Sequence, residues 1–96
     1  MARYRQIPDL VDARQFTGGR ENAEALLIWL KSNGCDATWV DNQTVMDIHL
    51  VERLQFVAPS NEKIVFSAYR KDYIVLMGQK WRIFPERKFR ERFEKI

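Results

Sequence analysis

The chain has 96 residues, of which 46% are hydrophobic and 30% charged, and its formal net charge is +3. This composition is typical of one globular domain and excludes a disordered tail. No apolar run approaches the roughly 20 residues of a membrane-spanning helix, and the first residues lack the apolar core of a signal peptide. One cysteine, Cys35, and one histidine, His49, exclude an internal disulfide and a four-ligand Cys/His zinc site. We therefore expect a single cytoplasmic domain over residues 1–96 without a cofactor.

The amino-terminal third predicts two strands followed by a helix. Tyr4–Ile7 and Val11–Phe16 are extended segments separated at Pro8, which disfavours helical backbone in the residue before it. A turn at Gly18-Gly19 precedes the helix Arg20–Asn33. Its apolar residues recur at helical spacing, and Gly34 can adopt the left-handed conformation that ends a helix. The glycine pair before a helix is also a candidate anion site, although turn geometry explains it equally.

The middle of the chain predicts a series of antiparallel strands. Thr38–Val40 and Thr44–Val51 flank a hairpin-like turn at Asp41-Asn42-Gln43. Arg53–Ala58 alternates apolar and polar residues, and Lys63–Ala68 is a further strand with Ile64 and Phe66 inward.

The carboxy-terminal third predicts a central strand, a hairpin and a short helix. Tyr73–Met77 is apolar throughout, as in a strand covered on both faces, and Gly78 begins a tight turn into Trp81–Phe84. From Pro85 to the last residue we expect a helix whose apolar stripe contains Phe89 and Phe93. Its charges form two ladders at i, i+4 spacing, Glu86–Arg90–Glu94 and Arg87–Glu91–Lys95. The predicted fold class is α+β, a mostly antiparallel sheet packed by one long helix and a short carboxy-terminal helix.

Catalytic patterns are sparse. Asp47 and His49 lie two residues apart on one face of a predicted strand, which is a spacing for a general acid/base pair. No candidate nucleophile or phosphate-binding loop lies nearby in sequence, so the alternative is a surface histidine. Cys35 has no basic neighbour in sequence to lower its pKa and is interpreted as a packing residue. We expect no catalytic residues and no enzymatic activity.

The positive charge belongs to one segment. Residues 80–96 carry a balance of +4, so the rest of the chain sums to about −1. Aromatic residues are interleaved with these charges, which is a pattern for contacts with phosphates and bases. Helical spacing assigns Phe89 and Phe93 to docking and pairs several arginines with glutamates. The cations left over are Lys80, Arg82 and Lys88. The sequence therefore predicts at most a weak nucleic-acid interaction.

A protein partner is the alternative that we favour. Trp29 and Trp39 fall outside the clearest core positions, and Tyr69 lies at a turn beside Arg70. Tyrosine, tryptophan and arginine dominate the energetics of protein interfaces. For any single ring, however, packing inside the domain is the interpretation that we favour. The candidate binding residues are Tyr69, Arg70, Lys80, Arg82 and Lys88. Open sheet edges also make a homodimer possible, whereas no membrane contact is expected.

The amino terminus carries a further pattern. Tyr4-Arg5-Gln6-Ile7-Pro8 is followed by Ala13-Arg14-Gln15-Phe16-Thr17-Gly18. This resembles small phage-encoded proteins of unknown function that begin with Tyr-Arg-x-x-Pro and Ala-x-Gln-Phe-Thr-Gly and have a later Gly-Asp-Tyr-Ile turn. Here Asp72-Tyr73-Ile74 matches that turn, with Lys71 in place of glycine, and Phe93 stands where tyrosine is usual. The resemblance implies a bacteriophage origin, expression in the host cytoplasm and no established enzymatic activity. Because surplus aromatic and basic residues come without catalytic chemistry, we expect a non-enzymatic binding protein, a phage accessory factor that interacts with a host protein.

Overall fold

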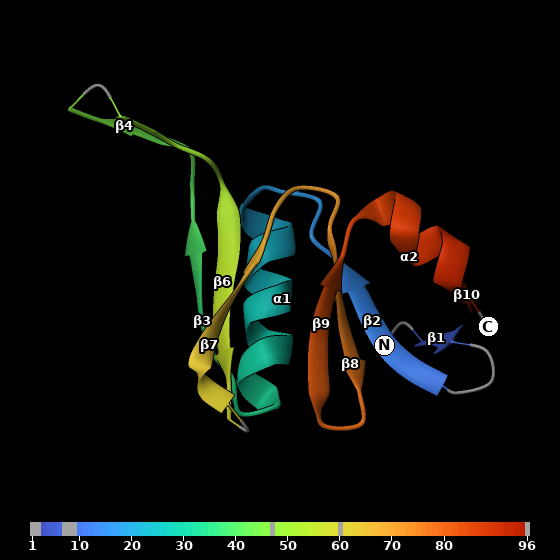
Figure 1. Ribbon diagram of the computed structural model, residues 1–96. Helices are drawn as coiled ribbons and strands as arrows, with labels where there is room; N and C mark the ends of the chain where they lie inside the picture. The colour runs from blue at the N-terminus through green and yellow to red at the C-terminus, as the bar shows by residue number, and fades with distance from the viewer. Residues whose placement is uncertain (1–2, 7–9, 47, 60, 96) are drawn as a thin grey trace.

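The computed structural model describes residues 3–6, 10–46, 48–59 and 61–95 (Figure 1). The fold class is α+β, as predicted: two helices pack with a five-stranded sheet, a three-stranded sheet and a two-stranded ribbon, all antiparallel. The elements in chain order are β1 (Arg3–Gln6), β2 (Leu10–Gln15), α1 (Arg20–Ser32), β3 (Asp36–Val40), β4 (Gln43–Val45), β5 (Ile48–Leu50), β6 (Arg53–Ala58), β7 (Asn61–Ala68), β8 (Tyr73–Met77), β9 (Lys80–Phe84), α2 (Glu86–Arg92) and β10 (Phe93–Lys95).

The five-stranded sheet has the order β10-β1-β2-β8-β9 and is covered on both faces. Because successive side chains of a strand point to opposite faces, Ile74 of β8 packs in the core around α1. Its neighbours Tyr73 and Val75 pack in a second core with Phe89 of α2. The prediction that Tyr73–Met77 is a central strand buried on both faces is confirmed.

Helix α1 lies between the five-stranded and the three-stranded sheet (Figure 1). Its buried residues join side chains from both sheets in the larger core, whose fully buried members include Phe16, Leu30, Leu54, Phe56 and Ile74. The helix ends as predicted, because Gly34 has φ 84 and its N–H donates to the carbonyl of Lys31 at 3.0 Å. With 13 residues the helix has about the average length for globular proteins, so its description as long is not confirmed.

The hairpin predicted around Asp41-Asn42-Gln43 is wrong. β3 pairs with β6, and the turn lies instead between β4 and β5, where Met46 has φ 50 and is 90% exposed. The run Thr44–Val51 is thus two strands rather than one. The β3–β6 and β4–β5 ladders share one register, because Val40 faces Arg53 and Gln43 faces Leu50. They form one long hairpin whose outer part projects from the body as a ribbon (Figure 1).

Two residues close the base of this ribbon. The side-chain oxygen of Asn42 accepts the backbone N–H of Glu52 at 2.7 Å, where the two ladders are interrupted. The interruption lets the Glu52 side chain turn inward, and Glu52 is the one charged residue buried among those that the structure describes. A side-chain acceptor here replaces a carbonyl of the sheet, which satisfies the buried backbone donor.

The carboxy-terminal helix is shorter than predicted. It ends at Arg92, and Phe93–Lys95 form β10, which pairs with β1. Strand pairing supplies these residues with backbone partners that a frayed last helical turn would lack. The charge ladders are correspondingly shortened to Arg90–Glu86 at 3.3 Å and Arg87–Glu91 at 3.8 Å, since Glu94 and Lys95 lie beyond the helix.

Stacked rings fix α2 on the sheet. The rings of Tyr73 and Phe89 stack with their centroids 3.8 Å apart, and Phe89 stacks on Phe93 at 4.7 Å. Phe84 meets Phe93 edge-on at 5.4 Å. The aromatic stripe of the last segment is therefore core, as the helical spacing predicted, although Phe93 reaches this core from a strand.

The turn before β8 carries an unusual backbone. Lys71 has φ 78, in the left-handed region that favours glycine. Its N–H donates to the carbonyl of Phe16 at 2.6 Å, and its carbonyl accepts the side chain of Gln15 at 3.0 Å. The resemblance drawn from the sequence patterns predicts glycine at this position. Neighbouring contacts hold the conformation in place without one.

Candidate functional site

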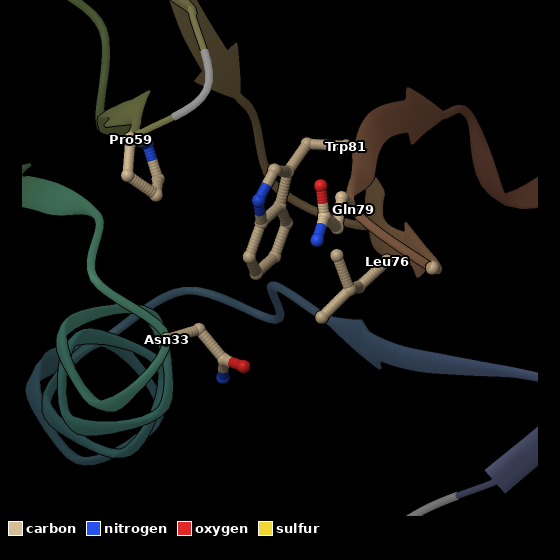
Figure 2. Close-up of a pocket in the computed structure, with 6 residues that line it drawn as sticks. Asn33, Pro59, Leu76, Gln79 and Trp81 are labelled. Atoms are coloured by element: carbon tan, nitrogen blue, oxygen red, sulfur yellow. The ribbon is translucent and has the colours of Figure 1, made fainter.

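Two hollows of the described surface lie beside Trp81. A pocket of about 430 Å³ lies between the end of α1 and the β8–β9 turn, lined by Asn33, Pro59, Leu76, Gly78, Gln79 and Trp81 (Figure 2). We call it the Pro59 pocket. A second hollow, of about 270 Å³, lies between β7 and β9 and is lined by Ala58, Ile64, Phe66, Gln79, Lys80, Trp81 and Arg82. We call it the Trp81 groove. The two hollows share Gln79 and Trp81, so they are neighbours on the surface.

Trp81 lines both hollows and is held rigidly. It is only 7% exposed, and its ring meets Trp29 and Phe56 edge-on, each with centroids 5.4 Å apart. In Figure 2 the indole nitrogen lies on the edge of the ring turned toward Pro59, and Gln79 and Leu76 lie beside the ring. A ring fixed by two other rings presents a preformed surface, which lowers the entropic cost of binding.

Exposed side chains form the walls of the Trp81 groove. On β7, Ile64 is 47% exposed and Phe66 is half-buried. On β9, Lys80 and Arg82 are exposed on either side of Trp81 in the sequence. The groove thus has an apolar wall on β7 and two cations at its rim on β9.

The five predicted binding residues lie in three places. Lys80 and Arg82 line the Trp81 groove together. Tyr69 and Arg70 lie in the turn that leads into β8, at the other end of that strand from Lys80, which pairs with Met77. Lys88 lies on α2 and is exposed there. The structure therefore does not unite the five residues in one surface.

Arg70 belongs to an internal cluster. Its guanidinium donates to one oxygen of Glu52 at 2.8 Å, while the other oxygen accepts the N–H of Gly19 at 2.9 Å and the indole N–H of Trp39 at 3.0 Å. We call these four residues the Glu52 cluster. The hydrogen bond from Arg70, followed by that from Gly19, lowers the pKa of the Glu52 carboxyl, outweighing the effect of its burial.

The Glu52 cluster occupies the candidate anion site at the glycine pair Gly18-Gly19. Gly19 caps the amino terminus of α1, where the helix dipole favours negative charge. The anion in this place is the chain's own Glu52. At Gly18 an added Cβ would lie 2.6 Å from the Nε of Arg70, so the guanidinium lies across a position that glycine leaves open. Sequence reasoning missed Glu52, because nothing about a single glutamate between two strands marks it as buried.

The three tryptophan and tyrosine candidates divide similarly. Trp29 is buried, donates its indole N–H to Asp12 at 3.3 Å and lies under the guanidinium of Arg14, 4.8 Å from the ring centroid. Trp39 is half-buried and donates to Glu52. Tyr69 alone is exposed. For Trp29 the packing alternative is therefore correct, since its ring is buried in the core around α1.

The catalytic candidates gain little support. Asp47 lies outside the described residues, and of His49 the structure describes only the backbone, in β5. Cys35 packs in the larger core as predicted, and burial raises the pKa of its thiol. Across the described ranges no group of three or more His, Cys, Asp or Glu is placed to hold a metal ion. No helix in the described part of the chain is long and apolar enough to cross a membrane.

Comparisons of the chain with protein families, with curated protein sequences and with solved structures find no match. The resemblance to small phage-encoded proteins thus remains a prediction from the sequence patterns. The candidate site rests on its geometry alone.

Proposed function

We propose that this chain is a non-enzymatic binding protein that contacts another protein through the Trp81 groove. The observation that carries the proposal is the composition of that groove. A buried tryptophan forms its floor, an exposed isoleucine forms the wall on β7, and two cations lie at its rim on β9. Protein interfaces combine an apolar centre with a polar rim, and fixed aromatic rings are their most frequent anchors.

The sequence patterns suggest the setting of this interaction. Because the amino terminus resembles small phage-encoded proteins, we propose that the chain is a bacteriophage accessory protein. In this proposal it acts in the cytoplasm of the host, and its partner is a host protein. The exposed apolar side chain of Ile64 supports a protein surface rather than nucleic acid as the partner, since phosphate contacts require mainly cations.

A capture experiment with two matched variants tests the proposal. Ile64 and Val65 are adjacent on β7, both exposed, and point to opposite faces of the strand; only Ile64 lines the groove. We expect tagged wild-type protein to retain a specific bacterial protein after nuclease treatment. We expect Ile64→Asp to lose it and Val65→Asp to keep it. Equal retention by both variants would contradict the proposal, as would capture that disappears with nuclease.

A further inference from the structure

β9 is an edge strand beside the Trp81 groove, and β7 of the other sheet approaches it across that groove. β9 is the last strand of its sheet, and β8 is its one partner among the described strands. The two-residue loop Gly78-Gln79 makes the flanking pair, Met77 and Lys80, a hydrogen-bonded pair. Hydrogen-bonded and non-hydrogen-bonded pairs alternate along an antiparallel ladder. The backbone groups of Arg82 and Phe84 therefore point toward β8, and those of Trp81 and Ile83 point away from it.

The pairing of β8 with β2 leads to the same alternation of hydrogen-bonded residues. The carbonyl of Asp72 accepts the N–H of Phe16, which continues β2, at 2.8 Å. Asp72 and the residues two and four positions later therefore direct their backbone groups toward β2. The backbone groups of Tyr73, Val75 and Met77 therefore point toward β9. Their partners in the register are Phe84, Arg82 and Lys80, so the two ladders agree.

A strand added at this edge would present its side chains to two different surroundings. Side chains on the α1 face of the sheet would lie beside Trp81 and Ile83 and enter the groove toward Ile64. Side chains on the α2 face would lie beside Lys80 and Arg82, since Phe84, two residues after Arg82, packs in the core around α2. The added strand would therefore need apolar residues on the first face and anionic residues on the second.

The α2 face carries a row of cations. Lys80 and Arg82 are exposed, and the guanidinium of Arg92 lies over the ring of Phe84, 5.5 Å from its centroid. We call these three residues the cation row. None of the three makes an ion pair with another described residue, in contrast to Arg87 and Arg90, which pair with glutamates of α2. The row thus lacks acidic partners within the described part of the chain.

The cation row also excludes one occupant. If two copies of the chain paired through β9, the lysines and arginines of both strands would lie side by side, which is unfavourable. Cations on an edge strand commonly prevent such self-pairing. An acidic strand from a different protein meets no such repulsion, so charge complementarity favours it over a second copy.

From these observations we propose that the edge of β9 binds an extended segment of a partner protein as an additional strand, and that this segment alternates acidic and apolar residues. The inference rests on the proposed function and specifies the mode of recognition. Backbone hydrogen bonds to Trp81 and Ile83 supply affinity, while the groove and the cation row select alternate side chains.

Synthetic peptides test this mode directly. The probe is a capped peptide of alternating residues, Glu-Val-Glu-Val-Glu-Val-Glu, titrated into the full chain by calorimetry. The first control has the same composition in blocks, Glu-Glu-Val-Val-Val-Glu-Glu, and the second has lysine in place of glutamate. We expect the alternating peptide to bind about tenfold more tightly than the block peptide, because only the alternating one satisfies both faces at once. Equal affinities would show general charge attraction and would overturn the inference.

One change to the protein and one to the peptide separate the contribution of the cation row from that of the backbone hydrogen bonds. In the double variant Lys80→Glu/Arg82→Glu, we expect affinity for the glutamate peptide to fall about tenfold or more and affinity for the lysine peptide to rise. Methylation of the peptide's backbone nitrogens that face β9 should weaken binding about tenfold, while methylation of the intervening nitrogens should not. Equal effects of the two methylation patterns would exclude strand addition.

The outcome is distinguishable from a failure of the proposed function. If none of the peptides binds, while Ile64→Asp still abolishes capture of a bacterial protein, the groove binds a partner by another mode and strand addition is wrong. If the alternating peptide binds and both Ile64→Asp and Val65→Asp retain the captured protein, the β9 edge accepts strands but the proposed function is wrong.

Discussion

The Glu52 cluster and the Trp81 groove use similar residues to opposite effect. Each combines tryptophan, arginine and a nearby glycine turn. In the Glu52 cluster the guanidinium of Arg70 and the indole N–H of Trp39 are both bound to one buried carboxylate. In the Trp81 groove Arg82 is exposed, with no carboxylate partner among the described residues. A basic and aromatic group of residues is therefore a candidate binding surface only where its charges have no internal counter-ion.

Loss of the Trp81 ring should have the largest effect. Trp81→Ala removes a buried ring that contacts two other rings, and we expect the free energy of unfolding to fall by about 3–5 kcal/mol. Trp39→Phe keeps most of the ring volume and removes one hydrogen bond to Glu52, so about 1 kcal/mol is expected. Urea unfolding measures both. A smaller loss for Trp81→Ala than for Trp39→Phe would contradict the role of Trp81 as a fixed floor.

Removal of the buried carboxylate ranks next. Glu52→Ala leaves the N–H groups of Gly19 and Trp39 without their acceptor, and we expect a loss of about 2–4 kcal/mol. Glu52→Gln retains an oxygen that can accept part of these hydrogen bonds, so its free energy of unfolding should fall by less. Chemical denaturation at neutral pH provides the comparison. Wild-type stability in Glu52→Ala would show that the cluster does not hold the two turns together.

The same carboxylate predicts a pH dependence. The pKa of Glu52 is lowered from its ordinary value of 4.5, first by the bond from Arg70 and then by that from Gly19. A lowered pKa means that the unfolded chain binds the proton more readily, so this stabilisation is present above pH 4.5 and is lost as the pH falls through the folded-state pKa. The stability difference between wild type and Glu52→Gln should shrink over this range in a series of urea titrations. A constant difference would contradict the assignment.

Two arginines give the most direct contrast between the regions. Arg70→Ala removes a bond to Glu52, but the guanidinium side chain is 61% exposed and partly screened, so we expect a loss of about 1–2 kcal/mol. Arg82→Ala should change stability by less than about 0.5 kcal/mol, since nothing internal depends on it. Thermal unfolding of the two variants under identical conditions is sufficient. Equal losses would remove the distinction between the two regions.

A gain of stability is expected at Lys71. Its left-handed backbone is costly for a residue with a Cβ, and Lys71→Gly should raise the free energy of unfolding by about 0.5–1 kcal/mol. Lys80, which lies in a strand, provides the control, because Lys80→Gly should destabilise. If Lys71→Gly is destabilising as well, the turn does not have the conformation described.

The sequence predicted the elements whose pattern is local. Helix α1, the central strand β8 and the β8–β9 turn at Gly78 follow from spacing and glycine placement, and each is confirmed. The errors arise where pairing with another strand determines where an element begins or ends. The β4–β5 turn depends on the pairing of β3 with β6, and the early end of α2 depends on the pairing of β10 with β1. Neither partner lies next in the chain.

The candidate site was predicted in part for the same reason. Lys80 and Arg82 alternate along one strand, so their proximity is local and the sequence revealed it. Ile64 was predicted to point inward, and its exposure follows from a gap between two sheets that no local pattern reports. Arg70 was assigned to the binding surface because its partner, Glu52, is 18 residues distant in the chain.

Amide hydrogen exchange along β9 tests the central claim most directly. In the free protein we expect the N–H groups of Trp81 and Ile83 to exchange quickly and those of Arg82 and Phe84 to exchange slowly, because only the latter two point toward β8. Addition of the alternating glutamate–valine peptide should slow Trp81 and Ile83 and leave the other two unchanged. If Trp81 is already as protected as Arg82 in the free protein, the edge of β9 is not open and the account is contradicted.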